Sequence, residues 1–166
     1  MKIKEGTLDG KGCRFALVVS KFNEFVTSRL MTSTLETLQQ QGVDEESIET
    51  VRVPGAFEIP LVARQLARSK RYDAIICLGA VIRGETPHFD YISTEMSRGI
   101  AEASWETGIP IVFGVLTTNT AEQAVERSGA PEKNRGADAA RTAIEMVTLM
   151  KELQTIGRNT TGFLSS

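Results

Sequence analysis

The 166-residue chain is poor in cysteine, histidine and tryptophan, with two, one and one residues respectively. Both cysteines, Cys13 and Cys77, stand in apolar runs of strand length, so we expect buried free thiols of a reducing compartment rather than a disulfide. No set of cysteine, histidine and carboxylate residues has the spacing of metal ligands. The sequence therefore predicts a protein without a metal site.

The chain also lacks an excess of charge and any long apolar run. Its formal net charge is −2, which gives no reason to expect nucleic acid or an anionic membrane as a partner. The apolar runs are too short to span a bilayer, and residues 1–12 are polar and lack the apolar core of a signal peptide. With the expected free thiols, these absences predict a cytoplasmic protein that does not bind membranes.

What the chain does contain is an alternation of strand and helix patterns. Apolar content of 41% and charged content of 24% are typical of a globular protein, and the length suits one domain. Right-handed crossovers between such strands predict an α/β fold: a three-layer, flavodoxin-like sandwich with a four-stranded parallel sheet and helices on both faces. We expect strands at 13–20, 48–53, 72–78 and 111–116, and helices at 25–41, 59–70, 87–107, 120–128 and 136–153.

The chain ends are expected to differ from this domain. Residues 1–12 are predicted to be an N-terminal arm, a candidate for one more strand in this chain or in a neighbour. Residues 13–154 are predicted to form the single domain. Residues 155–166 are small and polar, which predicts a disordered tail.

The stretch 75–91 contains the closest grouping of residues suited to ligand binding and proton transfer. We expect its strand to break at Gly79 and again at Gly84, and a helix to begin with Thr86 as N-cap and Pro87 as first helical residue. Free backbone N–H groups before a helix form a site for an anion such as phosphate. His88, the only histidine, comes next and can transfer protons near neutral pH. A lone histidine at a helix start is more often structural, so this hypothesis depends on the neighbouring loop.

Four loops follow the four predicted strands, at residues 21–24, 54–58, 80–88 and 117–120. The carboxyl ends of parallel strands share one edge of a sheet, and ligands of open α/β sheets bind there. These loops concentrate aromatic, polar and glycine residues, whereas the loops 42–45 and 69–71 at the opposite edge are ordinary. The asymmetry predicts a site at the carboxyl edge.

The residue types suggest a flat, polar ligand. Phe22, Phe57 and Phe113 offer flat faces for a planar heterocycle. Core packing is the alternative for Phe57 and Phe113, and it is less expected for Phe22, which stands in a polar loop. Glu58 and Asn23 are suited to bind a polyol or a ring edge. Their alternatives are a carboxylate at a helix start and an asparagine in a turn.

A phosphate group is the second expected ligand feature. Gly84, Glu85 and Thr86 are candidates to bind it through main-chain N–H groups. Arg127 and Arg135 are candidates to add fixed positive charge, although isolated arginines are usually solvated.

Known nucleotide and flavin patterns do not fit the chain. The loop after the first strand, residues 20–24, has no glycine, unlike the phosphate loop of a flavodoxin. Gly79 and Ala80 stand where a response-regulator receiver has its aspartate. A P-loop and a GxGxxG fingerprint are also absent.

The loop sequences together resemble the 6,7-dimethyl-8-ribityllumazine synthase family of riboflavin biosynthesis. The similarity covers about residues 10–153, and four motifs occur in the family's order. The matching segments are 20–23, 54–60, 79–90 and 114–120, continued by 123–124, Arg127 and 134–136.

The resemblance implies an activity and an assembly. Such an enzyme condenses 5-amino-6-(D-ribitylamino)uracil with 3,4-dihydroxy-2-butanone 4-phosphate, gives the lumazine, phosphate and water, and uses no cofactor or metal. It works as a homopentamer, or as a hollow sixty-subunit shell, with sites between subunits.

The resemblance also implies residue roles. His88 transfers protons. Phe22 stacks on the pyrimidine, with Asn23 beside it. The ribityl chain lies near Ala56, Phe57 and Glu58, and the ring near Ala80 and the backbone of Val81 and Ile82. Phosphate is held by Gly84, Glu85, Thr86 and Arg127, while Phe113, Arg127 and Arg135 come from an adjacent subunit.

Two departures from the family pattern stand out. Arg135 replaces a frequent lysine, and the segment 129–134 differs from the glycine- and lysine-rich version of capsid-forming members, which favours pentamers over shells. Two alternatives remain open: a non-catalytic flavin- or lumazine-binding or shell-forming protein on the same fold, and an enzyme for another phosphorylated ketone. Phosphate release separates the first of these from the synthase, and substrate competition separates the second.

Overall fold

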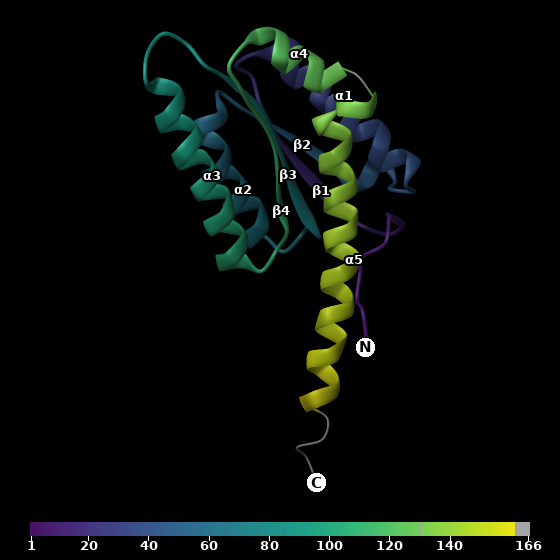
Figure 1. The fold of residues 1–166 in the computed structure, drawn as a ribbon. Coiled ribbons are helices and arrows are strands. Elements are labelled where there is room, and N and C mark those ends of the chain that lie inside the picture. The colour runs from purple at the N-terminus through teal and green to yellow at the C-terminus, as the bar shows by residue number, and fades with distance from the viewer. Residues whose placement is uncertain (130, 162–166) are drawn as a thin grey trace.

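The computed structural model describes residues 1–129 and 131–161, which contain a parallel sheet with strand order β2-β1-β3-β4. Figure 1 shows this sheet between two helical layers. The predicted three-layer α/β sandwich is thereby confirmed. The strands are β1 (Phe15–Ser20), β2 (Ile48–Val53), β3 (Ala74–Ile82) and β4 (Ile111–Thr118).

In the described part of the chain, five α-helices cover the sheet. α2 and α3 lie against one face, while α1, α4 and α5 lie on the other (Figure 1). Short 3-10 turns stand at Glu45–Ser47, Ala56–Glu58 and Pro131–Lys133. The helices are α1 (Glu24–Gln40), α2 (Ile59–Arg68), α3 (His88–Thr107), α4 (Ala121–Gly129) and α5 (Arg135–Thr161).

The core consists of two apolar clusters, one on each face of the sheet. Successive side chains of a strand point to opposite faces. Phe15 and Leu17 therefore join the cluster under α1 and α5, whereas Ala16 and Val18 join the one under α2 and α3. Every residue of β1 is buried, because this central strand is covered on both sides. This explains why the strand reads as a continuous apolar run in the sequence.

The strand β3 is longer than predicted, and the expected break at Gly79 is wrong. Gly79 pairs with Val115 of β4 inside the sheet. A β-carbon at Gly79 would lie 3.1 Å from both the Ile59 side chain and the Ser20 hydroxyl. The glycine therefore admits close packing of neighbouring residues without ending the strand, and the loop begins only at Arg83.

The start of α3 also differs from the prediction. The helix begins at His88, Pro87 occupies the N-cap position, and Thr86 is not the cap. The helix therefore starts one residue later than expected. His88 is its first residue and stands directly against the preceding loop.

Both chain ends involve α5. This helix continues to Thr161 and so includes residues 155–161 of the predicted tail, while 162–166 lie outside the described residues. The N-terminal arm packs along α5 of its own chain, where Thr7 N–H donates to Thr148 Oγ1 at 2.8 Å and Lys4 pairs with Glu152 at 2.7 Å. Within the described residues the arm adds no strand to the sheet. No helix of this described part is long and apolar enough to cross a membrane.

Candidate functional site

The first two loops at the carboxyl edge are bonded to each other. Lys21 N–H donates to the Val53 carbonyl at 2.7 Å, and Phe22 N–H donates to the Pro54 carbonyl at 3.0 Å. Asn23 has left-handed backbone angles, and its side-chain amide donates to the Ala80 carbonyl at 2.9 Å. The loop after β1 is therefore fixed both to the loop after β2 and to the end of β3.

Asn23 thus has a structural contact where the sequence suggested a substrate contact. Its Nδ2 is engaged by Ala80, so this atom holds two segments of the site together. Asparagine tolerates the left-handed conformation better than most residues, which suits it to this turn.

The other two loops are joined through Arg83. Its backbone N–H donates to the Thr118 carbonyl at 2.8 Å, which extends the pairing of β3 with β4. Its side-chain Nε donates to Asn119 Oδ1 at 3.1 Å. The start of α4 has part of a capping box: Gln123 N–H donates to Thr120 Oγ1 at 3.1 Å, while the Gln123 side chain accepts from Asn119 N–H at 2.9 Å.

The aromatic residues of the first two loops face outward. Phe22 is 71% exposed and Phe57 is 58% exposed, so neither ring packs in the core. Ala56, Ala80 and Val81 are buried beneath this edge. The arrangement leaves two flat apolar faces uncovered above a rigid floor, as a planar ligand requires.

The loop Gly84–Thr86 and His88 are the residues of this edge for which the sequence predicts anion binding. All four side-chain positions are exposed, and a β-carbon at Gly84 would meet no atom within 4 Å. The loop leads into the N-terminus of the twenty-residue helix α3, whose dipole and terminal N–H groups favour an anion. A titratable imidazole therefore stands at the same helix end as a candidate phosphate cradle.

Phe113 is not brought to these loops. It lies opposite Cys77 in the middle of the sheet and five positions before Thr118, the last residue of β4. At about 3.3 Å per residue, that is about 16 Å from the carboxyl edge. Its ring is 39% exposed on the open side of β4. Phe113 is therefore too far away to contact a ligand bound at the loops of the same chain.

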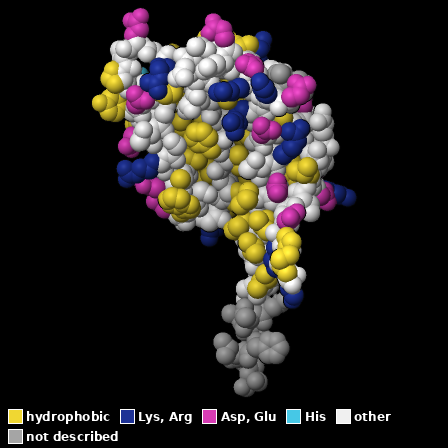
Figure 2. All heavy atoms as spheres, viewed as in Figure 1, with side chains coloured by type: hydrophobic (Ala, Val, Ile, Leu, Met, Phe, Trp, Pro, Cys, Tyr) yellow, Lys and Arg dark blue, Asp and Glu magenta, His cyan; other side chains and the backbone are white. Residues whose placement is uncertain are grey.

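Arg135 shares a groove with Phe113, again away from the loops. The groove has a volume of about 300 Å³ and runs between the free edge of β4 and the first half of α5. Figure 2 shows apolar side chains gathered over β4 and along α5 on this side of the molecule. Its lining includes Ile111, Val112, Phe113, Arg135, Asp138 and Met146.

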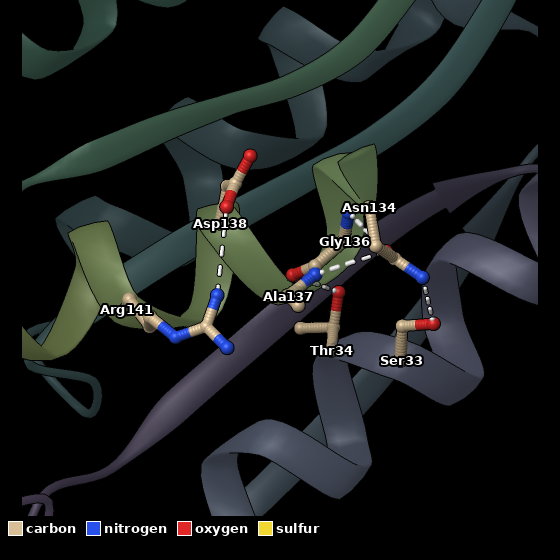
Figure 3. A network of polar contacts seen from close by, with 7 residues as sticks. All are labelled: Ser33, Thr34, Asn134, Gly136, Ala137, Asp138 and Arg141. Carbon is tan, nitrogen blue, oxygen red and sulfur yellow. Dashed lines mark hydrogen bonds and ion pairs between the residues drawn. The ribbon is translucent and has the colours of Figure 1, made fainter. Parts of the chain in front are cut away.

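Arg135 and Arg127 are positioned by a buried asparagine that the sequence analysis did not single out. Asn134 is 6% exposed, and its Oδ1 accepts from Gly136 N–H at 2.9 Å and Ala137 N–H at 3.1 Å (Figure 3). Its Nδ2 donates to Ser33 Oγ at 2.6 Å and to the Ser128 carbonyl at 3.3 Å. The signal in the sequence was an asparagine before a helical pattern, the usual N-cap.

Asn134 consequently connects three helices. Its contacts reach α1 through Ser33, the end of α4 through Ser128, and the first turn of α5. Thr34 of α1 adds a hydrogen bond of 3.0 Å to the Gly136 carbonyl (Figure 3). Arg127 lies on α4 one residue before Ser128, and Arg135 opens α5, so both arginines depend on this connection.

We expect Asn134→Ala to lower the free energy of unfolding by about 2–3 kcal/mol, because the N-cap is lost and a buried carbonyl loses its donor. Asn134→Asp keeps the two N-cap acceptor bonds, and we expect it to be less damaging. Urea unfolding of both variants measures the difference. A stability of Asn134→Ala equal to that of the unchanged protein would show that the network contributes nothing.

One carboxylate next to Arg127 in the chain, that of Glu126, is held by an ion pair. Lys133 Nζ donates to Glu126 Oε1 at 2.9 Å, and this hydrogen bond lowers the pKa of the Glu126 carboxyl. The neighbouring carboxylate is therefore already paired with a lysine. Arg127 itself is exposed.

Other features of the described chain do not add to this site. A larger groove of about 690 Å³ between α1 and α4 is lined by none of the residues predicted for the site. Within residues 1–129 and 131–161, no three histidine, cysteine or carboxylate side chains are grouped to hold a metal ion. Cys13 and Cys77 are both buried and free, as predicted, and burial raises the pKa of each thiol.

Comparison with known proteins gives one consistent result. A family profile described as 6,7-dimethyl-8-ribityllumazine synthase matches residues 12–151. A protein of that name from Syntrophus aciditrophicus is 56% identical over 151 residues, which cover 91% of this chain and 98% of the relative. Another of that name from Clostridium kluyveri is 51% identical over 154 residues, covering 93% of this chain and the whole relative.

Proposed function

This chain belongs to the 6,7-dimethyl-8-ribityllumazine synthase family, and we propose that the four loops at the carboxyl edge of its sheet hold the substrates. It is a transferase of riboflavin biosynthesis. It condenses 5-amino-6-(D-ribitylamino)uracil with 3,4-dihydroxy-2-butanone 4-phosphate, and it releases the lumazine, phosphate and water. The observation that carries the proposed site is the set of hydrogen bonds joining these loops in pairs.

The pyrimidine substrate is assigned to the first two loops and the end of β3. Phe22 stacks on the ring, and the residues at Ala56, Phe57 and Glu58 hold the ribityl chain. The exposed phenyl faces and the carboxylate at the start of α2 support this assignment. The backbone of β3 at 80–82, buried at 80 and 81 and half-buried at 82, forms the floor beside the ring.

The phosphorylated ketone is assigned to the loop before α3. Gly84, Glu85 and Thr86 bind its phosphate through main-chain N–H groups at the helix N-terminus. His88 transfers protons as the 5-amino group forms an imine with the ketone, phosphate leaves and the ring closes. The loop and the imidazole are adjacent in the chain, so one bound molecule reaches both.

The remaining three residues are assigned to an adjacent subunit. Phe113 is about 16 Å from the carboxyl edge of its own sheet, and it shares an exposed groove with Arg135. A second copy placing this groove over the loops would add Phe113 and Arg135 to the site, and Arg127 on α4 of that copy is the third residue that we assign there. We assign the chain to a homopentamer in the cytoplasm, with the sixty-subunit shell as the alternative assembly.

The proposed chemistry is tested by mixing the purified protein with both substrates and no added metal or cofactor. Lumazine absorbance and free phosphate should rise together in equal amounts, faster than in the uncatalysed control. Phe22→Ala should raise the KM of the pyrimidine by about tenfold, because a stacking face is lost. Acceleration that is unchanged in Phe22→Ala would remove the first loop from the site.

A further inference from the structure

We propose that Arg83 is a positioning residue that fixes the segment 84–88 in the conformation that binds phosphate and places His88. The inference rests on the proposed function of that loop and adds a residue to it. Arg83 is the first residue after β3, and four residues separate it from His88. Its side chain contacts Asn119 of the fourth loop and the two residues that follow His88.

The start of the segment is fixed to the sheet. The Arg83 backbone N–H donates to the Thr118 carbonyl at 2.8 Å, and its Nε donates to Asn119 Oδ1 at 3.1 Å. Asn119 is itself held by Gln123, whose side-chain oxygen accepts the Asn119 N–H at 2.9 Å. The guanidinium is therefore attached to a loop that α4 supports.

A terminal nitrogen and the flat face of the guanidinium hold the end of the segment. A terminal nitrogen of Arg83 lies 3.4 Å from Asp90 Oδ1, and the guanidinium carbon lies 4.4 Å from the centroid of the Phe89 ring. Phe89 and Asp90 are the two residues directly after His88. One planar group thus connects the fourth loop to the first turn of α3, and the segment 84–88 lies between its two anchor points.

Arginine suits this position better than lysine. Its guanidinium has several donors in a fixed plane and stacks on aromatic rings, whereas an ammonium is a point charge on a flexible stem. The pair with Asp90 is exposed at both ends, with 45% and 60% of the side chains accessible, so the ion pair alone contributes little. The effect of Arg83 comes from restricting the loop, and catalysis is sensitive to misplacement by about 1 Å.

The first test measures amide hydrogen exchange in Arg83→Met and in a matched control, Arg98→Met. Arg98 is exposed, as Arg83 is, and pairs with Glu102 at 2.9 Å. It lies on α3, away from the loop. We expect exchange of the Asp90 N–H, which donates to the Pro87 carbonyl at 3.1 Å, to be about tenfold faster in Arg83→Met and unchanged in Arg98→Met. Unchanged exchange in Arg83→Met would overturn the inference.

The second test separates positioning from direct binding of substrate. Arg83→Met should raise the KM of the butanone phosphate and lower kcat, each by about tenfold, while the KM of the pyrimidine stays within about twofold. Arg83→Lys keeps the charge and should recover little of this loss. Asn119→Ala should show a smaller loss of the same kind, and adding it to Arg83→Met should have little further effect.

The outcomes also separate this inference from the proposed function. Full activity and full protection in Arg83→Lys would overturn positioning by the planar group. A kinetic loss without faster exchange would make Arg83 a substrate ligand and would equally overturn it. If the unchanged protein made no lumazine, the proposed function would fail, and the exchange experiment would still decide the role of Arg83. Should Arg83→Met fail to fold, Arg83→Lys and Asn119→Ala decide by the same measurements.

Discussion

Replacing His88 with alanine is expected to lower kcat by about 10²–10⁴-fold and to leave the KM of both substrates within about threefold. The imidazole opens α3 directly after the loop assigned to phosphate, and it is exposed there to a bound molecule. Imine formation, phosphate loss and ring closure each move a proton. Binding, in contrast, is assigned to the residues of the four loops and not to the imidazole itself, so turnover should suffer more than affinity.

The control for His88→Ala is His88→Gln. Glutamine keeps a polar side chain that can form hydrogen bonds at the helix start, but it cannot exchange a proton near neutral pH. Steady-state kinetics of both variants should therefore show the same large loss of kcat. Recovery of most activity in His88→Gln would indicate that His88 acts through hydrogen bonding and not as an acid or base.

Replacing Arg127 with alanine is expected to raise the KM of the butanone phosphate by about 10–100-fold. A charge-assisted hydrogen bond to phosphate contributes about 1.5–3 kcal/mol, which corresponds to this range of affinity. The KM of the pyrimidine should change much less, because the phosphate belongs to the other substrate. Initial rates measured while one substrate is varied at a time give both constants.

Arg68→Ala is the matched control for this variant. Arg68 ends α2 at the opposite edge of the sheet and lies 3.6 Å from Glu106. The substitution Arg68→Ala removes the same charge from the surface, but far from the loops. The kinetics of this variant should therefore match those of the unchanged protein. An equal rise in KM for both arginine variants would mean that net charge, not a local contact, attracts the phosphate.

The fold could be predicted from the sequence because its central strands are covered on both faces. Continuous apolar runs such as 15–20 identify such strands, and helical patterns between them require parallel crossovers. Strand boundaries are harder to predict at a glycine, because glycine can either end a strand or allow close packing inside one. Gly79 was expected to end a strand, yet it lies within β3 because Ile59 and Ser20 pack against it from other parts of the chain. Such long-range packing is not visible in local sequence.

The sequence predicts which loops form the site, but not the contacts that individual side chains make there. The rule that ligands bind at the carboxyl edge places four loops together without any knowledge of side chains. The contacts of Asn23, Arg83 and Asn134 depend on tertiary partners that are 57, 36 and 101 residues away in the chain. Their structural roles therefore emerge only from the fold.

The position of Phe113 matters most for the assignment of the site, because it places this ring away from the loops of its own chain. Its place inside β4 was visible in the sequence, but its distance from the loops depends on the register with β3. The helix α5 likewise continues past the predicted end at Leu153, because no proline interrupts residues 154–161 and the sequence there can remain helical. The free edge of β4 and α5 are the surface that we propose a neighbouring subunit contacts.

The most direct test of a site shared between subunits is to form mixed oligomers from His88→Ala and Arg127→Ala chains, by unfolding and refolding them together. If His88 and Arg127 of one site come from different subunits, about a quarter of the sites in a random one-to-one mixture contain both unchanged residues. When the butanone phosphate is kept well below its KM for Arg127→Ala, lumazine formation should then rise well above that of the two variants refolded separately and combined afterwards. Activity that stays at the level of the separate variants would contradict the account, because it would place both residues of each site in the same chain.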